Sequence, residues 1–515
     1  MRITASGVIP KARFHCSTSL LRTATAVGTA LAIAFGLTLA QPASAQLRGG
    51  DVGRTMNIGP RSMSPGGFGM RLDPTFRVTP GNVDATTDSG GGGSGGGSTG
   101  ARKVHKTPKS QNNIQTTHTG RGSGGSQSAR RGSTGVPPAG ERRFASDELV
   151  IEATLSEQQI TALAARLRLV RLESLRLSLT NTTFYRWRIP DGRSVPTVIR
   201  AVLADGSVRV QPNYFYIHAQ EGAAAPAAAS QGDPAQYALA KLRLGQAHGL
   251  ARGDKIKVAV IDSGIDVDHP ELAGVIAGQY DALDSKEGPH PHGTGIAGII
   301  ASHARLMGAA PGVQILAVRA FDNAQGSTFS ILKSLDWAVS QNARVINMSF
   351  AGPSDPALQR ALAAARQKGA ILIAAAGNGG PKAQAAHPAA DPGVIAVTAT
   401  DADDKLFAKA NRGSYVAIAA PGVDILMPAP GGAYQMSSGT SMAAAYVAGV
   451  AALILERQPQ LDPDAVKKVL LTTARDLGPK GRDDQFGAGL ADAYQALMSV
   501  ETKSADTAGA GRAGR

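Results

Sequence analysis

The sequence predicts an α/β protein in which helices cover both faces of a parallel sheet, preceded by a smaller α+β domain. Two patterns carry this prediction. Between residues 237 and 500, short continuous apolar runs alternate with Ala- and Leu-rich stretches, as expected of strands that are buried on both faces and joined by helices. Residues 143–220 instead give the order strand, helix, strand, strand, helix, strand, which is the ferredoxin-like plan.

Each element of the smaller domain has its own local signal. Period-two alternation predicts the strands, and Ser156 followed by Glu157 marks the start of the first helix. The expected strands are 148–153, 170–179, 183–189 and 208–217, and the expected helices are 157–167 and 196–203. An Ala-, Pro- and Gly-rich stretch at 221–236 then predicts an exposed, cleavable linker.

The larger domain, residues 237–500, is predicted from apolar runs that are too short and too continuous for amphipathic helices. The expected strands are 256–261, 315–318, 345–348, 371–375 and 394–397. The polar, Gly- and Ala-rich residues 501–515 predict a disordered tail.

Residues 1–45 have the pattern of a signal peptide. Cationic residues precede an apolar run from 24 to 40, and the sequence Pro42-Ala43-Ser44-Ala45 predicts cleavage before Gln46. The alternative is an uncleaved membrane anchor, but the run is short for a bilayer span and is interrupted by glycine and threonine. We therefore expect a secreted protein, either extracellular or periplasmic. Because the single cysteine, Cys16, lies in this segment, the mature chain would have no disulfide.

Residues 46–142 combine Gly/Ser repeats with scattered lysines and arginines. Such a composition cannot bury enough apolar surface to form a core, so we expect a disordered basic linker. The formal net charge of the whole chain is +14, which leaves weak polyanion binding or a tether to the cell envelope as an alternative role for this segment. Its aromatic residues are limited to Phe68 and Phe76, whereas nucleic-acid-binding segments usually interleave aromatic with basic residues.

Three motifs in the larger domain carry polar groups suited to catalysis. Asp262 directly follows an apolar strand, where open α/β sheets place their active sites. His292 stands at the head of a helix rich in small and apolar residues, and Ser441 opens a second, apolar helix. Free N–H groups at such a helix start favour a developing negative charge nearby. Taken singly, the aspartate could end any strand, the histidine could be structural and the serine could be a helix cap.

Taken together, the motifs follow the chain order Asp, His, Ser, and in that order and spacing they resemble the subtilisin-like serine peptidases, the subtilases. The matching blocks are Val258–Asp266, His290–Gly298 and Ser438–Ala445, with further similarity at Asn347–Phe350, Ala374–Asn378, Ala420–Gly422 and Phe486–Gly489. The resemblance extends from about residue 237 to residue 500. It implies a subtilisin-like fold, and it identifies residues 143–220 as similar to an inhibitor-type prodomain that would make the protein a zymogen. A permanent accessory domain is the alternative for that segment.

The resemblance also implies a role for each residue in a secreted serine endopeptidase. Ser441 would form an acyl-enzyme once His292 accepts its proton, and Asp262 would orient His292. Asn378 and the Ser441 N–H would bind the oxyanion. Substrate would lie along an edge strand, and the expected substrate-binding residues are Ser349, Phe350, Ala351, Gly352, Ala376 and Gly377. The expected partners are protein or peptide substrates and the chain's own prodomain, and the expected state is a monomer.

The sequence departs from the family pattern at four places. Ala445 stands where the family usually has proline, Gly295 replaces a commonly larger residue, and Ala351 replaces a usual glycine. The loop Ser302–Gly308 is short and has no Asn, Asp or Glu, so we expect the usual calcium site to be missing and no cofactor to be needed. A weaker calcium site elsewhere is the alternative. The alternative function is a catalytically silent or secondary protein of the same fold that binds polyanions or the cell envelope through residues 46–142.

Overall fold

The computed structural model describes residues 135–219, 221–224, 233, 235–285, 287–322 and 324–500. The expected signal peptide, the expected linker up to residue 134, much of the linker at 221–236 and the expected tail lie outside the described residues.

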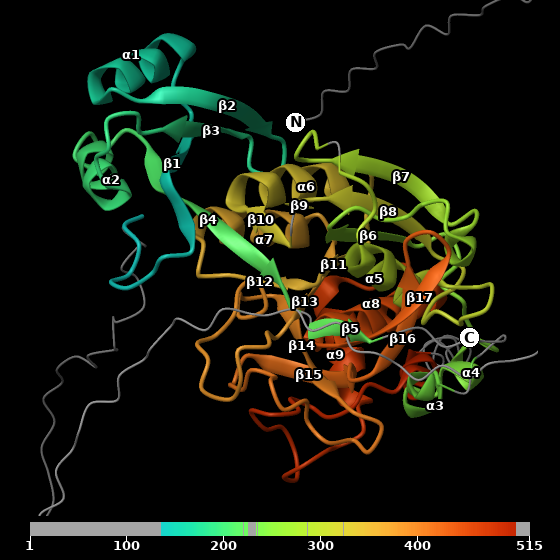
Figure 1. The fold of residues 1–515 in the computed structure, drawn as a ribbon. Helices are drawn as coiled ribbons and strands as arrows, with labels where there is room; N and C mark the ends of the chain where they lie inside the picture. The colour runs from blue at the N-terminus through green and yellow to red at the C-terminus, as the bar shows by residue number, and fades with distance from the viewer. Residues whose placement is uncertain are drawn as a thin grey trace, which may run out of the picture. The chain divides into compact units, whose positions relative to one another are not determined.

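Residues 144–218 form four antiparallel strands and two helices in the order expected from the sequence (Figure 1). These elements are β1 (Phe144–Ala153), α1 (Glu157–Leu167), β2 (Val170–Leu177), β3 (Thr182–Arg188), α2 (Val195–Leu203) and β4 (Arg209–His218). The strand order is β2-β3-β1-β4. Ser156 and Gln159 cap α1, because the side chain of each accepts the backbone N–H of the other. Trp187 of β3 is fully buried in the core that the sheet shares with both helices.

The larger domain is built on a seven-stranded sheet in which every pair of neighbours is parallel. Its strands are β6 (Lys257–Asp262), β7 (Ile276–Asp281), β8 (Gln314–Arg319), β11 (Val345–Met348), β13 (Ile371–Ala375), β14 (Val394–Thr400) and β15 (Val416–Pro421). They lie in the order β15-β14-β13-β11-β6-β8-β7. Strands β7 and β8 lie on one side of β6 and the later strands on the other, so the order in which the chain adds strands reverses beside β6. In open α/β sheets such a reversal opens a crevice at the carboxyl ends of the strands.

Helices cover both faces of this sheet, which confirms the predicted fold class. Val258 and Val260 of β6 share one core with α5 (Pro291–Ala301), α8 (Thr440–Arg457) and α9 (Pro463–Thr472). Ala259 and Ile261 of the same strand share a second core with α6 (Thr328–Ser340) and α7 (Pro356–Gln367). Because successive side chains of a strand point to opposite faces, the two sets of helices lie on opposite faces of the sheet. Two short helices, α3 (Tyr237–Lys241) and α4 (Leu244–Ala247), join the first core.

Helix α8 is long and apolar enough to cross a membrane by composition, but 89% of its 18-residue window is buried inside the protein. It packs against α5 and against several strands of the parallel sheet. It is therefore a core helix of the larger domain.

Further short strands lie outside the parallel sheet. They are β9 (Phe321–Asp322), β10 (Gln325–Ser327), β12 (Phe350–Ala351), β16 (Ile425–Ala429) and β17 (Ala433–Ser438), together with β5 (Glu221–Ala224). Strand β4 continues beyond its own sheet and pairs antiparallel with β10 and β12, while β5 pairs antiparallel with β17. The end of the smaller domain therefore lies along β10 and β12 of the larger domain (Figure 1).

Candidate active site

The fold brings Asp262, His292 and Ser441 to the carboxyl edge of the sheet. Asp262 is the last residue of β6, His292 is the second residue of α5 and Ser441 is the second residue of α8. All three are fully buried. The start of α5 approaches β6 closely because Gly293 has no side chain: a Cβ there would lie 2.6 Å from the carbonyl oxygen of Ser263.

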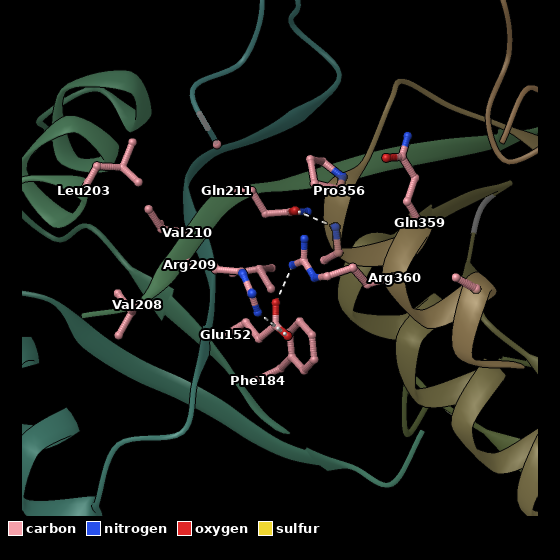
Figure 2. Close-up of a pocket in the computed structure, with 14 residues that line it drawn as sticks. Glu152, Phe184, Leu203, Val208, Arg209, Val210, Gln211, Pro356, Gln359 and Arg360 are labelled. Atoms are coloured by element: carbon pink, nitrogen blue, oxygen red, sulfur yellow. Dashed lines mark hydrogen bonds and ion pairs between the residues drawn. The ribbon is translucent and has the colours of Figure 1, made fainter. Parts of the chain in front are cut away.

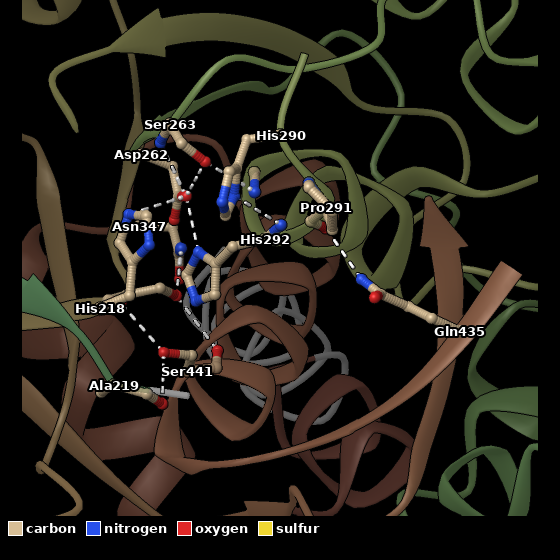
Figure 3. Close-up of polar contacts among 12 residues, drawn as sticks. His218, Ala219, Asp262, Ser263, His290, Pro291, His292, Asn347, Gln435 and Ser441 are labelled. Carbon is tan, nitrogen blue, oxygen red and sulfur yellow. Dashed lines mark hydrogen bonds and ion pairs between the residues drawn. The ribbon is translucent and has the colours of Figure 1, made fainter. Parts of the chain in front are cut away.

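Asp262 and His292 are in direct contact (Figure 3), with 2.6 Å between Oδ1 and Nδ1. Asp262 Oδ1 also accepts the backbone N–H of Ser263 at 2.8 Å. Burial alone would raise the pKa of Asp262, but the neighbouring His292 and His218 and these hydrogen bonds hold it below its usual value. Since a carboxylate can only accept, Nδ1 of His292 carries the hydrogen and Nε2 is left as the base.

Ser441 directs its hydroxyl to two backbone carbonyl groups. Its Oγ lies 2.7 Å from the oxygen of Ala219 and 2.9 Å from that of Ser349. Its backbone N–H points at the same Ala219 oxygen, at 3.3 Å. His292 Nε2 is buried and has no hydrogen-bond partner within the described residues. Proton transfer from Ser441 to His292 therefore requires the serine O–H to turn from these carbonyl oxygens toward Nε2.

The Asn378 side chain is oriented by Thr440, the residue before Ser441. Asn378 Oδ1 accepts the Thr440 N–H at 3.1 Å and the Thr440 hydroxyl at 2.8 Å, so its other side-chain atom is the NH₂ group. That Nδ2 is buried and unpartnered in the part of the chain that the structure describes. With the Ser441 N–H it offers two donors to a developing oxyanion.

Ala376 and Gly377 lie in the turn that leads to Asn378. Ala376 is buried, its N–H donates to the Val397 carbonyl at 2.9 Å, and its own carbonyl accepts the Tyr415 hydroxyl at 2.8 Å. Gly377 has a φ of +104°, and its N–H donates to the Thr440 hydroxyl at 3.1 Å. These hydrogen bonds hold the turn that carries Asn378, and substrate binding by Ala376 and Gly377 stays a prediction.

Residues 215–219 occupy the cleft as an extended peptide between β10 and β12. His218 lies opposite Phe350, Ile217 opposite Ala351, and Tyr216 opposite Gly326. The N–H of Ala219 donates to the Ser349 carbonyl at 3.3 Å. The strand predicted to bind substrate therefore pairs with a peptide. The second wall, β10, was not predicted because its sequence, Gln325-Gly326-Ser327, has no apolar alternation.

His218, which sequence reasoning did not single out, packs directly on the catalytic candidates. Its ring is stacked on that of His292, with centroids 4.0 Å apart and planes 7° from parallel, and its Nε2 lies 3.4 Å from Asp262 Oδ1. Burial, with a smaller contribution from His292, lowers the pKa of His218 to about 3, so the ring is neutral at pH 7.

The same three residues bring possible metal-binding atoms within 4.8 Å of one another. Zinc lies about 2.0–2.1 Å from an imidazole nitrogen, close to the plane of the ring because the lone pair lies in that plane. Two rings stacked 4.0 Å apart cannot both direct a lone pair at one ion. His218, Asp262 and His292 therefore do not fit a zinc site.

The short loop at 302–308 is held by the carboxylate of Glu271, which is fully buried. Its two oxygens accept the backbone N–H groups of Ala304, Arg305 and Leu306 at 2.9–3.0 Å and the Tyr434 hydroxyl at 2.9 Å. Four donors therefore surround the Glu271 carboxylate beside this loop, whose own sequence has no Asn, Asp or Glu.

Two of the expected departures from the family pattern have local partners. A Cβ at Gly295 in α5 would overlap the sulfur of Met427, so the β16 side chain fills the space that a larger residue would take. Ala351 pairs with Ile217 in the cleft. Ala445 lies in the regular, fully buried part of α8.

Comparison with known proteins gives consistent similarities over the larger domain. The model of the subtilase family matches residues 253–489. Thermitase of Thermoactinomyces vulgaris is 35% identical over 272 residues, which cover 51% of this chain and 96% of thermitase. Subtilisin E of Bacillus subtilis is 36% identical over 275 residues, covering 51% of this chain and 71% of that protein.

One solved structure extends the similarity. Fervidolysin from Fervidobacterium pennivorans, described as a keratinolytic enzyme related to subtilisin, superposes with a TM-score of 0.59 at 26% identity. The match covers 69% of this chain and 61% of fervidolysin.

Proposed function

This chain belongs to the subtilase family and is a serine endopeptidase, and from that premise we propose that Ser441, His292 and Asp262 hydrolyse peptide bonds in an exported enzyme made as a zymogen. The observation that carries the proposal is the position of the Ala219 carbonyl. Its oxygen accepts hydrogen bonds from the Ser441 hydroxyl and N–H, which brings this carbonyl group next to the nucleophile. The first substrate would be the bond between Ala219 and Gln220.

In this mechanism His292 Nε2 takes the proton of the Ser441 hydroxyl while Oγ attacks the carbonyl carbon. The oxygen becomes an oxyanion, which the Ser441 N–H and Asn378 Nδ2 stabilise. The imidazolium, oriented by Asp262, returns its proton to the leaving amine, and an acyl-enzyme on Ser441 remains. Water, activated by His292, then releases the carboxylic acid and restores the serine.

Contacts between the smaller domain and helices α6 and α7 support its role as an inhibitor. Figure 2 shows Glu152 of β1 meeting Arg209 and Arg360 in a pocket between the smaller domain and α7, with an ion pair to Arg360. On α6, Lys333 pairs with Glu173 at 2.9 Å. These contacts hold residues 215–219 in the cleft, so the same segment that is cleaved also blocks other substrates.

N-terminal sequencing of the processed protein tests the proposal. We expect the mature enzyme to begin at Gln220, to hydrolyse casein and to be labelled at Ser441 by a serine-directed fluorophosphonate. The Ser441→Ala chain should stay intact and unlabelled. An unprocessed, unlabelled protein of unaltered sequence would contradict the proposal.

Export and linker function rest on sequence alone. The pattern of residues 1–45 supports removal of a signal peptide before Gln46, which the same sequencing detects in the Ser441→Ala precursor. The cations of residues 46–142 support weak polyanion binding. Retention of that precursor on heparin, lost at moderate salt and lost when residues 46–142 are deleted, would establish it.

A further inference from the structure

Tyr216 fills a closed pocket beside the cleft, at the fourth residue before the bond proposed for cleavage. Its side chain is fully buried, whereas that of the next residue, Ile217, is 58% exposed. The ring packs edge-on against Phe350, with centroids 5.8 Å apart and planes at 83°. A Cβ at Gly352 would overlap this ring. The pocket is therefore shaped for an aromatic side chain and depends on the glycine.

The inner end of the pocket carries a buried carboxylate. The Tyr216 hydroxyl donates to Asp355 Oδ2 at 2.9 Å, and Asp355 is only 1% exposed. The Thr328 hydroxyl donates to the same oxygen at 2.6 Å. Burial and the charge of Asp355 raise the pKa of Tyr216 well above its usual value, so the phenol remains a hydrogen-bond donor at neutral pH. The pocket thus recognises the hydroxyl as well as the ring.

Removal of the smaller domain would leave this carboxylate in place but with fewer donors. Gln211 donates to Asp355 Oδ1 at 2.6 Å and departs with Tyr216. The N–H groups of Ala357 and Leu358 at the start of α7 remain on Oδ1, each at 3.0 Å. The Thr328 hydroxyl remains on Oδ2. Oδ1 then keeps two donors, whereas Oδ2 keeps one and has lost the phenol, so the mature pocket has a place for one phenol hydroxyl on Oδ2.

We propose that Asp355 makes the mature peptidase select tyrosine over phenylalanine at the fourth residue before the scissile bond. The inference rests on the proposed function and specifies its substrates: extended peptide segments with a phenol donor at that position. Phenylalanine fills the same volume but leaves the carboxylate without its donor. Sites built to hydrogen-bond a substrate hydroxyl discriminate strongly against analogues that lack it.

Four peptides test the selectivity with the enzyme matured from the full-length chain. Their sequence is X-Ile-His-Ala-p-nitroanilide, taken from the segment in the cleft, with tyrosine, 4-aminophenylalanine, phenylalanine or 4-fluorophenylalanine as X. Tyrosine and 4-aminophenylalanine carry a hydrogen-bond donor on the ring, whereas phenylalanine and 4-fluorophenylalanine do not. Because hydrogen bonds to charged groups contribute about 1.5–3 kcal/mol, we expect kcat/KM for the first two peptides to exceed that for the other two by roughly tenfold or more. Equal values for all four peptides would overturn the inference.

The variant Asp355→Ser identifies the acceptor. Serine still caps α7 but has no second oxygen for the phenol, so the ratio of kcat/KM for tyrosine to that for phenylalanine should fall close to one. Fluorophosphonate titration gives the folded fraction of the variant. If the variant does not fold, the four peptides tested on the enzyme of unaltered sequence decide whether the pocket selects tyrosine. A preference that survives in Asp355→Ser overturns the inference. An unlabelled, inactive enzyme of unaltered sequence would overturn the proposed function itself, whereas a labelled enzyme that does not discriminate overturns only the pocket's selectivity.

Discussion

At the scale of single residues, the site keeps polar atoms ready for a reacting group. His292 Nε2, Asn378 Nδ2 and Asp262 Oδ2 are buried without hydrogen-bond partners among the described residues. Leaving a buried polar group unpaired destabilises a fold by about 1–3 kcal/mol. Two of these groups have partners that the reaction would supply: an oxyanion for Asn378 and a serine proton for His292.

Replacing Asn378 by alanine should lower kcat with little change in KM, because the oxyanion forms only after substrate has bound. Loss of an oxyanion asparagine from a subtilisin is known to lower kcat by about 10²–10³, and we expect a similar magnitude here. Thr440→Val, which removes one of two donors that orient Asn378, should give a smaller loss. The measurement is steady-state kinetics, with the active-site concentration taken from fluorophosphonate titration of a separate sample, and an unchanged kcat in Asn378→Ala would rule out this role.

His218 should make the stability of the precursor depend on pH. The folded pKa of about 3 lies below the ordinary value of 6.5. The neutral ring therefore contributes its full stability above pH 6.5, and this contribution is lost as the pH falls toward 3. Urea unfolding of the Ser441→Ala precursor, with and without His218→Phe, isolates the effect. The difference in unfolding free energy should change by up to about 1.4 kcal/mol per pH unit in that window. A pH-independent difference would contradict the assignment.

At the scale of elements, sequence patterns predicted those whose signal is local. The expected bounds of α1, β11 and β13 agree with the structure, because each is a periodic or continuous apolar run. The strands β9, β10 and β12 have two or three residues each, and what defines them is pairing with segments distant in sequence. The catalytic candidates could likewise be named from motifs. Asp355 could not, since its contact with Tyr216 joins positions 139 residues apart.

The loop at 302–308 should not depend on calcium, because Glu271 already meets its backbone N–H groups. We expect a metal chelator to leave both the melting temperature and the activity of the mature enzyme unchanged. Glu271→Gln should lower the free energy of unfolding by about 1–3 kcal/mol, since the amide places an N–H against the donor of Ala304 or of its neighbours. Tyr434→Phe, which removes one donor and leaves the carboxylate, should lower the free energy of unfolding by less. Chelator-induced destabilisation that added calcium reverses would refute the idea.

At the scale of the whole molecule, the smaller domain offers acidic groups to basic groups of the larger one. Glu152 pairs with Arg360, and Glu173 pairs with Lys333. Glu152 is only 5% exposed, so its carboxylate oxygens have little contact with water and are met by Arg360, Arg209 and Thr182 instead. A parallel sheet is rich in non-local contacts and folds slowly. Under the proposed function, the smaller domain, whose last strand extends along β10 and β12, would assist folding as well as inhibit.

Arg360→Ala should speed release of the cleaved domain. Glu152 would keep only the longer contact to Arg209, at 3.4 Å, and the weaker one to Thr182, and a buried carboxylate that loses a partner is destabilising. Because the Arg360 side chain is 33% exposed, solvent screening moderates the effect, and we expect roughly tenfold faster release. The measurement is the lag before peptide hydrolysis by the processed complex reaches its steady rate.

Arg366→Ala is the matched control for that experiment. Arg366 lies on the same helix, but its ion pair is to Asp464 of the larger domain, so its loss should leave the lag unchanged. Adding Glu152→Gln to Arg360→Ala should restore part of the lag, because the unpaired buried charge is then gone and only the attraction between the partners is lost. Equal lags in Arg360→Ala and Arg366→Ala would show that this ion pair does not hold the inhibitor in place, and that the strand pairing of residues 215–219 suffices.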